Sequence, residues 1–137
     1  MSINLDELGK KLHTKIDSGI DYLKSAKNHL EDVQKETETA IQAKLDAAKE
    51  AVVDKKQEAE TAKAKLEEYL EDKKTETEAA VAELKSNHDR KKLEKRAERA
   101  EKNAEACVEL ALYYAGEAQV AILEAAASRN DADAAAN

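Results

Sequence analysis

The chain has 137 residues, a length that suits one domain, and its formal net charge at pH 7 is −7. Ala, Glu, Leu, Lys and Arg supply 83 residues, whereas Pro, Phe and Trp are absent and Gly occurs three times. Such a composition is typical of long helices and coiled coils. It excludes β-sandwiches and barrels, which need β-branched and aromatic residues, and enzymes built on glycine-rich loops. The single cysteine excludes a disulfide scaffold.

The net charge and the N-terminal sequence indicate which partners and which cellular compartment to expect. An acidic balance argues against nucleic-acid binding, which needs a basic surface. The N-terminal residues lack the basic and apolar regions of a secretory signal, and no run of 18 apolar residues is present. We therefore expect a cytoplasmic chain that does not span a membrane. Leu, Ile, Val and Phe total only 24 residues, which borders on disorder, but the regular spacing of apolar residues favours a folded chain.

The first predicted element is one very long helix. Apolar residues recur every three or four positions from Leu5 to Leu84, so one face of a helix over about residues 3–86 would stay apolar. Steps of eleven residues, as in Leu30, Ile41 and Val52, alternate with heptad-like steps. This mixed heptad–hendecad pattern predicts near-straight helices. A break at Asn28, a possible helix cap, is the alternative.

One segment of this predicted helix is repeated 40 residues later. LEDVQKETETAIQA, starting at Leu30, matches LEDKKTETEAAVAE, starting at Leu70, with seven identities in the first twelve positions. The offset is close to eleven helical turns. In a continuous helix, both copies would therefore face the same way.

The stripe breaks between Leu84 and Leu93, where the sequence SNHDR contains residues that favour caps and turns. We predict a turn at about 86–89, a second helix at about 89–129 and a disordered tail at 130–137. If the second helix folds back on the first at this turn, residues whose numbers add to about 174 lie opposite each other. The basic segment 91–102 then lies against the acidic segment 72–83. The predicted fold is all-α, a long antiparallel helical hairpin or coiled-coil bundle that forms a single elongated domain over residues 1–129.

The second helix contains an unusually apolar stretch, Ala104–Ala127, in which 18 of 24 residues are apolar. A helix that is apolar around most of its circumference is buried on several sides, and a single partner helix cannot cover it. Its four glutamates argue against a membrane-spanning role. Gly116 weakens the helix and predicts a close helix crossing.

Other polar features have ordinary structural interpretations. The basic cluster Lys85–Lys102 has a local charge of +4 without interleaved aromatic residues, so we expect it to pair with the acidic first helix rather than with nucleic acid. The three histidines lack metal-ligand spacing, and Cys107 lies on the apolar stripe, where we expect it to be buried. An intermolecular disulfide or a reactive thiol is the alternative for Cys107. We predict no catalytic residues, no metal site and no cofactor.

The two apolar stripes predict a non-enzymatic structural or interaction protein, a coiled-coil scaffold or adaptor that forms a homodimer or a higher helical bundle and can hold a protein partner. The first helix exceeds the length of the second, so about residues 3–45 would remain uncovered and would associate. The predicted interface residues are Leu5, Leu8, Leu12, Ile16, Leu23, Val108, Leu112, Tyr114, Ala115 and Ile122.

Two alternative functions are consistent with the same sequence. In composition the chain is similar to granule-coating phasins, exchangeable apolipoproteins and late-embryogenesis-abundant proteins. The first two resemblances imply a peripheral amphipathic helix that binds lipid or hydrophobic granule surfaces. The third implies a stress protectant that becomes helical only on drying or crowding.

Overall fold

The computed structural model describes residues 2–32 and 35–136, with side chains from Asp6 onward. Over these ranges the chain is helical apart from short turns, which confirms the all-α class. The helices are α1 (Ser2–Asp32), α2 (Glu38–Val53), α3 (Lys56–Thr75), α4 (Glu78–Ser86) and α5 (Arg90–Ala136). At about 1.5 Å per residue, α5 is about 70 Å long. Each of the other helices packs mainly against α5.

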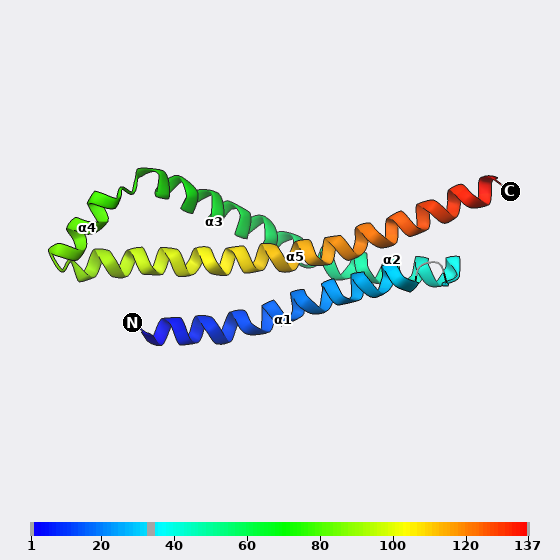
Figure 1. Cartoon of the computed structure of the whole chain (residues 1–137), viewed down its shortest axis with the longest axis horizontal. Helices are drawn as coiled ribbons and strands as arrows, with labels where there is room; N and C mark the ends of the chain where they lie inside the picture. The colour runs from blue at the N-terminus through cyan, green and yellow to red at the C-terminus, as the bar shows by residue number, and fades with distance from the viewer. Residues whose placement is uncertain (1, 33–34, 137) are drawn as a thin grey trace.

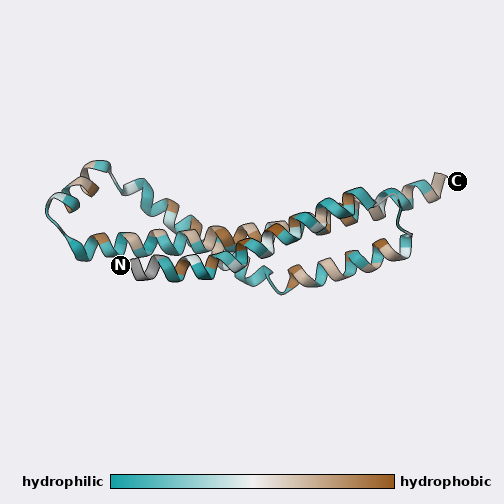
Figure 2. Ribbon diagram, turned by 60° about the horizontal axis from the view of Figure 1, so that its bottom comes forward, coloured by the Kyte–Doolittle hydropathy of each residue, from teal (hydrophilic) through white to brown (hydrophobic). Residues whose placement is uncertain are grey.

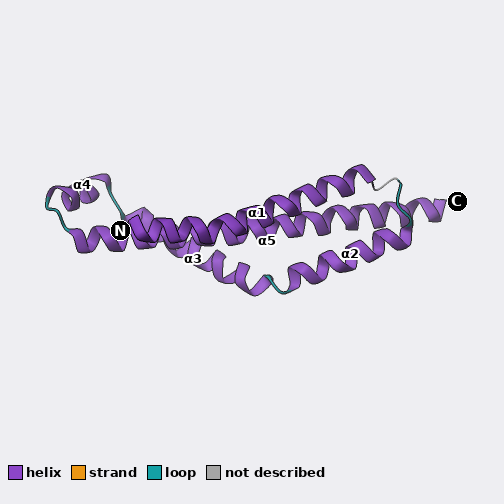
Figure 3. Ribbon diagram, turned by 90° about the horizontal axis from the view of Figure 1, so that it is seen from below, coloured by secondary structure: helices purple, strands orange, loops and turns teal. Residues whose placement is uncertain are grey.

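The helices form an elongated bundle around α5. The chain runs along α1, returns through α2, α3 and α4, and reverses again into α5 (Figure 1). Helix α1 is therefore parallel to α5, while α2 and α3 are antiparallel to it. In the view from below, α5 runs between α1 and α2 (Figure 3). The apolar residues concentrate where these helices meet near the middle of the molecule (Figure 2).

The predicted antiparallel pairing is confirmed for the chain from α2 to α5. Lys49 pairs with Glu124 at 3.5 Å, and Arg96 Nε pairs with Glu76 Oε1, so the paired residue numbers add to 173 and 172. The predicted charge match of segment 91–102 with segment 72–83 is thus present. The guanidinium of Arg96 donates a hydrogen bond that holds the pKa of Glu76 below its ordinary value.

The predicted continuous helix over 3–86 is wrong, because three breaks divide it. Two of them are helix starts capped by threonine: the hydroxyl oxygen of Thr37 accepts from the Ala40 amide at 3.1 Å, and that of Thr77 accepts from the Ala80 amide at 3.0 Å. Both threonines have an extended backbone, as N-cap residues do. They are 40 residues apart, at equivalent positions of the repeated segment. The repeat therefore encodes a helix start that occurs twice.

The third break lies at Asp54 and Lys55, between α2 and α3. Both residues keep right-handed helical backbone angles, and the Lys55 amide donates to the Val52 carbonyl instead of following the α-helical pattern. This single tightened turn kinks the chain without reversing it. The proposed break at Asn28 is also wrong, since Asn28 lies inside α1 and that helix ends at Asp32.

The predicted turn at 86–89 is confirmed. The amides of His88 and Asp89 donate to the carbonyls of Lys85 and Leu84, and His88 has a left-handed φ of 52°. This is a Schellman motif with histidine where glycine is usual. Asp89 then caps α5, because its Oδ1 accepts from the Lys92 amide at 3.2 Å.

The predicted disordered tail at 130–137 is wrong over the described residues, since α5 continues to Ala136. Four alanines lie between Ala132 and Ala136, and alanine has the highest helix propensity. Position 137 lies outside the described residues.

The core is small and lies between α2 and α5. Leu45, Ala48 and Val52 of α2 pack with Val120 and Leu123 of α5. The predicted apolar stripe is confirmed in α2 and α3, where the buried residues are Ile41, Leu45, Ala48, Val52, Ala59 and Ala62. Gly116 marks the predicted close crossing, since a Cβ atom placed on it would lie 2.7 Å from Cγ1 of Val52.

Candidate functional site

From Lys11 to Gly19, the contact between α1 and α5 keeps a nearly constant register. Lys11 pairs with Glu105 at 3.4 Å, and Lys15 pairs with Glu109, each pair being 94 residues apart. Further along, the nearest atom to a Cβ placed on Gly19 is the Cα of Leu112, at 4.0 Å. A constant offset of this kind is the signature of two parallel helices. The predicted hairpin therefore gains a third, parallel helix where an uncovered segment was expected.

The residues of α1 that face α5 are an unusual set for a helix interface. The half-buried or buried residues on this face of α1 are Leu8, Leu12, Lys15, Gly19, Tyr22, Ala26 and His29. Their spacing of three and four residues makes one continuous line, which we call the seam. From Lys15 onward the seam contains no aliphatic residue larger than alanine. From Lys15 onward, the ring of Tyr22 is therefore the largest apolar group of the seam.

A polar contact closes the seam near the end of α1. Nε2 of Gln119 lies 3.0 Å from Nε2 of His29. Burial lowers the pKa of His29, and the positive charge of Lys44 lowers it further. A neutral imidazole accepts a hydrogen bond from the amide nitrogen of Gln119 through Nε2, provided that its proton is on Nδ1.

The larger aliphatic residues of α1 lie beside the seam and remain exposed. Ile16, Ile20, Leu23 and Leu30 expose between 44% and 60% of their surface. Each of them follows a seam residue by one position. From Lys15 onward, the larger aliphatic side chains of α1 therefore lie beside the contact with α5 and not within it.

A second row of apolar residues occupies the matching side of α5. Val108, Ala111 and Ala118 precede by one position the residues of α5 that contact α1, which are Glu109, Leu112 and Gln119. Ile122 continues this row at helical spacing. Ala115 lies between Ala111 and Ala118 in the sequence, but it is buried and only 6% exposed. Because α1 and α5 are parallel, one side of the pair is formed by the residues that follow the contact positions on α1 and by the residues that precede the contact positions on α5. The two rows therefore form one surface.

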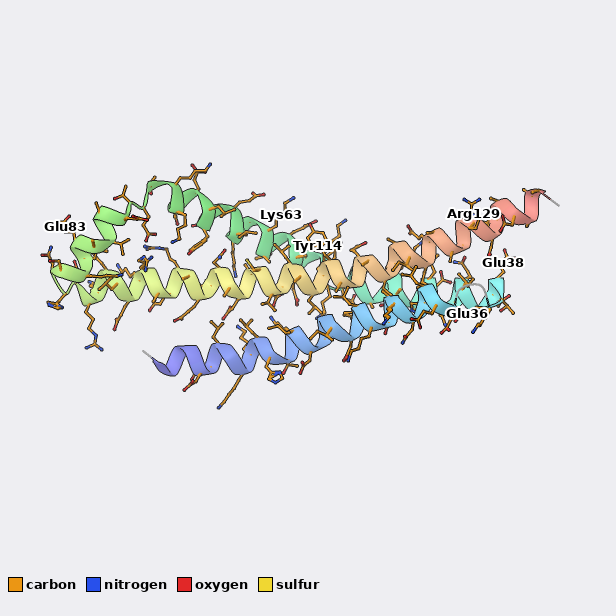
Figure 4. All side chains as sticks on the ribbon, in the orientation of Figure 1. Glu36, Glu38, Lys63, Glu83, Tyr114 and Arg129 are labelled. Atoms are coloured by element: carbon orange, nitrogen blue, oxygen red, sulfur yellow. The ribbon has the colours of Figure 1, made fainter. Side chains whose placement is uncertain are left out.

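We call this surface the open flank, and it consists of Ile16, Ile20, Leu23, Leu30, Val108, Ala111, Ala118 and Ile122. The flank on the other side of the α1–α5 pair is covered, because Tyr113 and Val120 of α5 pack in the core with α2. Tyr114 lies at the outer edge of the open flank. It is 57% exposed, and its ring meets that of Tyr113 edge-on with centroids 5.5 Å apart. Figure 4 shows Tyr114 near the middle of α5.

The predicted interface residues fall into four groups. Leu8, Leu12 and Leu112 lie in or beside the seam, while Tyr114 borders the open flank. Ile16, Leu23, Val108 and Ile122 belong to the open flank itself. Ala115 is buried within the chain and is only 6% exposed. The side chain of Leu5 lies outside the described residues. Ile20, Leu30, Ala111 and Ala118 complete the flank and were not singled out, although their spacing along the apolar stripes is visible in the sequence.

The predicted burial of Cys107 is wrong, since its side chain is exposed. It lies on the side of α5 that neither α1 nor α2 and α3 cover. The nearest hollow to the seam, about 310 Å³ in volume, lies between α1, α3 and α5 and is lined mainly by charged and polar side chains such as Lys11, Lys102 and Glu105. Across residues 2–32 and 35–136, no group of three or more His, Cys, Asp or Glu side chains is placed to hold a metal ion.

By length and composition alone, α5 is apolar enough to cross a membrane, and one third of its most apolar window is buried within the chain. The core helices of water-soluble bundles meet the same criterion. In this chain α5 packs against all four other helices, and its Glu109 is paired with Lys15.

Comparison with known proteins finds no family model, no curated protein and no solved structure that the chain matches.

Proposed function

We propose that the chain is a non-enzymatic, self-associating helical scaffold. The observation that carries this proposal is the open flank, in which four large aliphatic side chains of α1 are exposed beside an apolar row of α5. Scattered exposed aliphatic residues are ordinary, but a continuous apolar surface on a soluble protein marks an interaction site.

The total exposed surface supports the same proposal. The chain exposes 9758 Å². A compact monomer of 15.1 kDa exposes about 7,100 Å². Part of this excess area follows from the elongated shape. A standard interface buries about 1,200–2,000 Å² in total, or about 600–1,000 Å² on each partner, and the exposed surface of the chain is large enough to supply that area.

A matched pair of variants tests self-association. The double variant Ile20→Lys/Leu23→Lys places two charges on the open flank. The control is Leu70→Lys on α3, because Leu70 is 52% exposed and Leu23 is 54% exposed. Light scattering behind size exclusion should give a dimer or larger assembly for the wild type and for Leu70→Lys, and a monomer for Ile20→Lys/Leu23→Lys. A monomeric wild type, or an assembly that both lysine variants preserve, would refute the proposal. Far-ultraviolet circular dichroism should show unchanged helix content in all three proteins.

The second candidate function is peripheral binding to a lipid or hydrophobic granule surface. The observation that favours it is the same exposed row on α1, which borders Lys24 and Lys27, since amphipathic helices at membranes carry lysines beside their apolar face. Flotation with phosphatidylcholine vesicles, and with vesicles containing phosphatidylserine, tests this candidate. A protein that stays at the bottom of the gradient with both vesicles does not bind lipid surfaces.

A further inference from the structure

Building on the proposed self-association, we infer that the open flank is occupied by a second copy of this chain, related by a two-fold axis that runs along the helices. In this arrangement α1 of each copy packs on α5 of the other. The α1 and α5 helices of both copies form a parallel four-helix bundle, and α2, α3 and α4 of each copy lie on the outside of this bundle.

The sizes of the side chains on the open flank carry this inference. The row on α1 is large, with Ile16, Ile20, Leu23 and Leu30, whereas the middle of the row on α5 is small, with Ala111 and Ala118. A two-fold axis along the helices sets the large row of each copy on the small row of the other, and both inter-copy helix pairs then have the same spacing. Interfaces pack well when large residues face small ones.

The antiparallel alternative fits these rows less well. A two-fold axis across the helices would place α1 on its own copy and α5 on its own copy. One helix pair would then bring Ile and Leu together, and the other would bring alanines together. These pairs require different interaxial distances within the usual range of about 8–10 Å, so the flank would splay or leave a void.

The register between α1 and α5 also gives Tyr114 a partner. Because positions 94 residues apart lie at the same level along the bundle, Tyr114 of one copy lies level with Ile20 of the other. The exposed tyrosine ring would cover this isoleucine at the edge of the interface. Aromatic rings with one apolar face and one hydrated hydroxyl are enriched at such edges.

The area of the open flank is sufficient for a stable dimer. Between Ala104 and Ala126 the flank is about 33 Å long, and two helices side by side are about 20 Å wide. Each copy therefore contributes about 660 Å², and a dimer buries about 1,300 Å², which falls within the range of specific interfaces. A two-fold axis uses the same surface on both copies and closes the assembly at two chains.

Disulfide trapping tests the arrangement. In a Cys107→Ala background, one protein carries Leu23→Cys and a second carries Ala118→Cys, two positions that lie within about one helical turn of the same level across the proposed interface. Each protein is unfolded and refolded alone and in an equal mixture, and is then oxidised with copper phenanthroline. The proposal predicts a covalent dimer of about twice the chain mass only in the mixture, because a disulfide needs Cα atoms within about 7 Å.

The other outcomes overturn the arrangement in distinguishable ways. Covalent dimers in the separate Leu23→Cys and Ala118→Cys samples would indicate the antiparallel dimer. The absence of any covalent dimer, with a dimeric mass in light scattering, would overturn the two-fold arrangement. The proposed function would then stand if Ile20→Lys/Leu23→Lys still gave a monomer, and would fall with the arrangement if that variant stayed dimeric. A monomeric mass at every concentration would refute both. If that monomer also floated with phosphatidylcholine vesicles, the flank would be a lipid-binding surface.

Discussion

Gly116 of α5 lies directly beneath Val52 of α2, so closely that a Cβ atom on Gly116 would stand 2.7 Å from Cγ1 of Val52. Valine has essentially one side-chain rotamer in a helix and cannot turn away. Overpacking of this kind costs about 1–3 kcal/mol, which exceeds the gain of about 1 kcal/mol in helix propensity. Gly116→Ala should therefore lower the free energy of unfolding by about 1 kcal/mol, as measured by urea denaturation.

Gly9 is the control for this substitution, because no atom lies within 4 Å of a Cβ placed on it. Gly9→Ala should stabilise the helix by about 0.5–1 kcal/mol. If Gly116→Ala stabilised the protein as much as Gly9→Ala, the close crossing of α2 and α5 would be incorrect.

Leu123 is the most deeply buried leucine of the core and is 1% exposed. Leu123→Ala removes packing against α2 and should destabilise the protein by about 2–5 kcal/mol. Leu70→Ala is the matched control at an exposed position and should change the free energy of unfolding by less than about 0.5 kcal/mol. Equal effects of the two substitutions would contradict the assignment of the core to the α2–α5 contact.

The contact of His29 with Gln119 predicts a pH dependence of stability. The pKa of His29 is lowered by burial and by Lys44, so the unfolded chain binds this proton more readily than the folded chain. Stability should therefore fall as the pH drops below the ordinary histidine value of 6.5 toward the lowered pKa, and it should be fully retained above 6.5. Urea midpoints at pH 7.5 and 5.5 measure the effect.

The variant His29→Gln removes this titration while keeping a polar side chain. Other groups titrate in both proteins, so the difference between the two pH dependences isolates His29. We expect a smaller loss of stability on acidification in the variant. An equal loss in both proteins would mean that His29 is as easily protonated in the folded chain as in the unfolded one.

The two threonine caps should contribute similarly, because each accepts one amide hydrogen bond at a helix start. Thr37→Ala and Thr77→Ala should each lower the stability by about 1 kcal/mol. Thr39→Ala, one residue inside α2, is the control and should be neutral or slightly stabilising, since alanine has the higher helix propensity. A cap variant that behaved like Thr39→Ala would argue against a helix start at that position.

The sequence pattern predicts the parts of the fold that depend on local spacing. The stripe through Ile41, Leu45 and Val52 identifies the buried face of α2, and SNHDR identifies the turn before α5. Gly116 identifies the close crossing because glycine in a helix otherwise has no benefit. Each of these features is encoded by residues close together in the sequence, and each requires contact with only one other helix.

The reversal after α1 depends on signals that are too weak to predict alone. Neither proline nor glycine marks it, and threonine occurs at many positions that are not caps. The repeat of the segment around Thr37 at Thr77 is the visible sign. The choice of face on α1 is a tertiary effect, because the aliphatic row and the seam are neighbouring lines on one helix, and the contacts with α5 that lie along the seam, such as Lys15 with Glu109, are distant in the sequence.

The measurement that tests the open flank most directly is the molar mass of the wild-type chain, by light scattering over a hundredfold range of concentration. A dimer that closes over the open flank has a constant mass of about 30 kDa, twice the 15.1 kDa of one chain. A mass of 15.1 kDa throughout the range would show that the exposed aliphatic row of α1 does not bind a second copy, and would refute the proposed self-association.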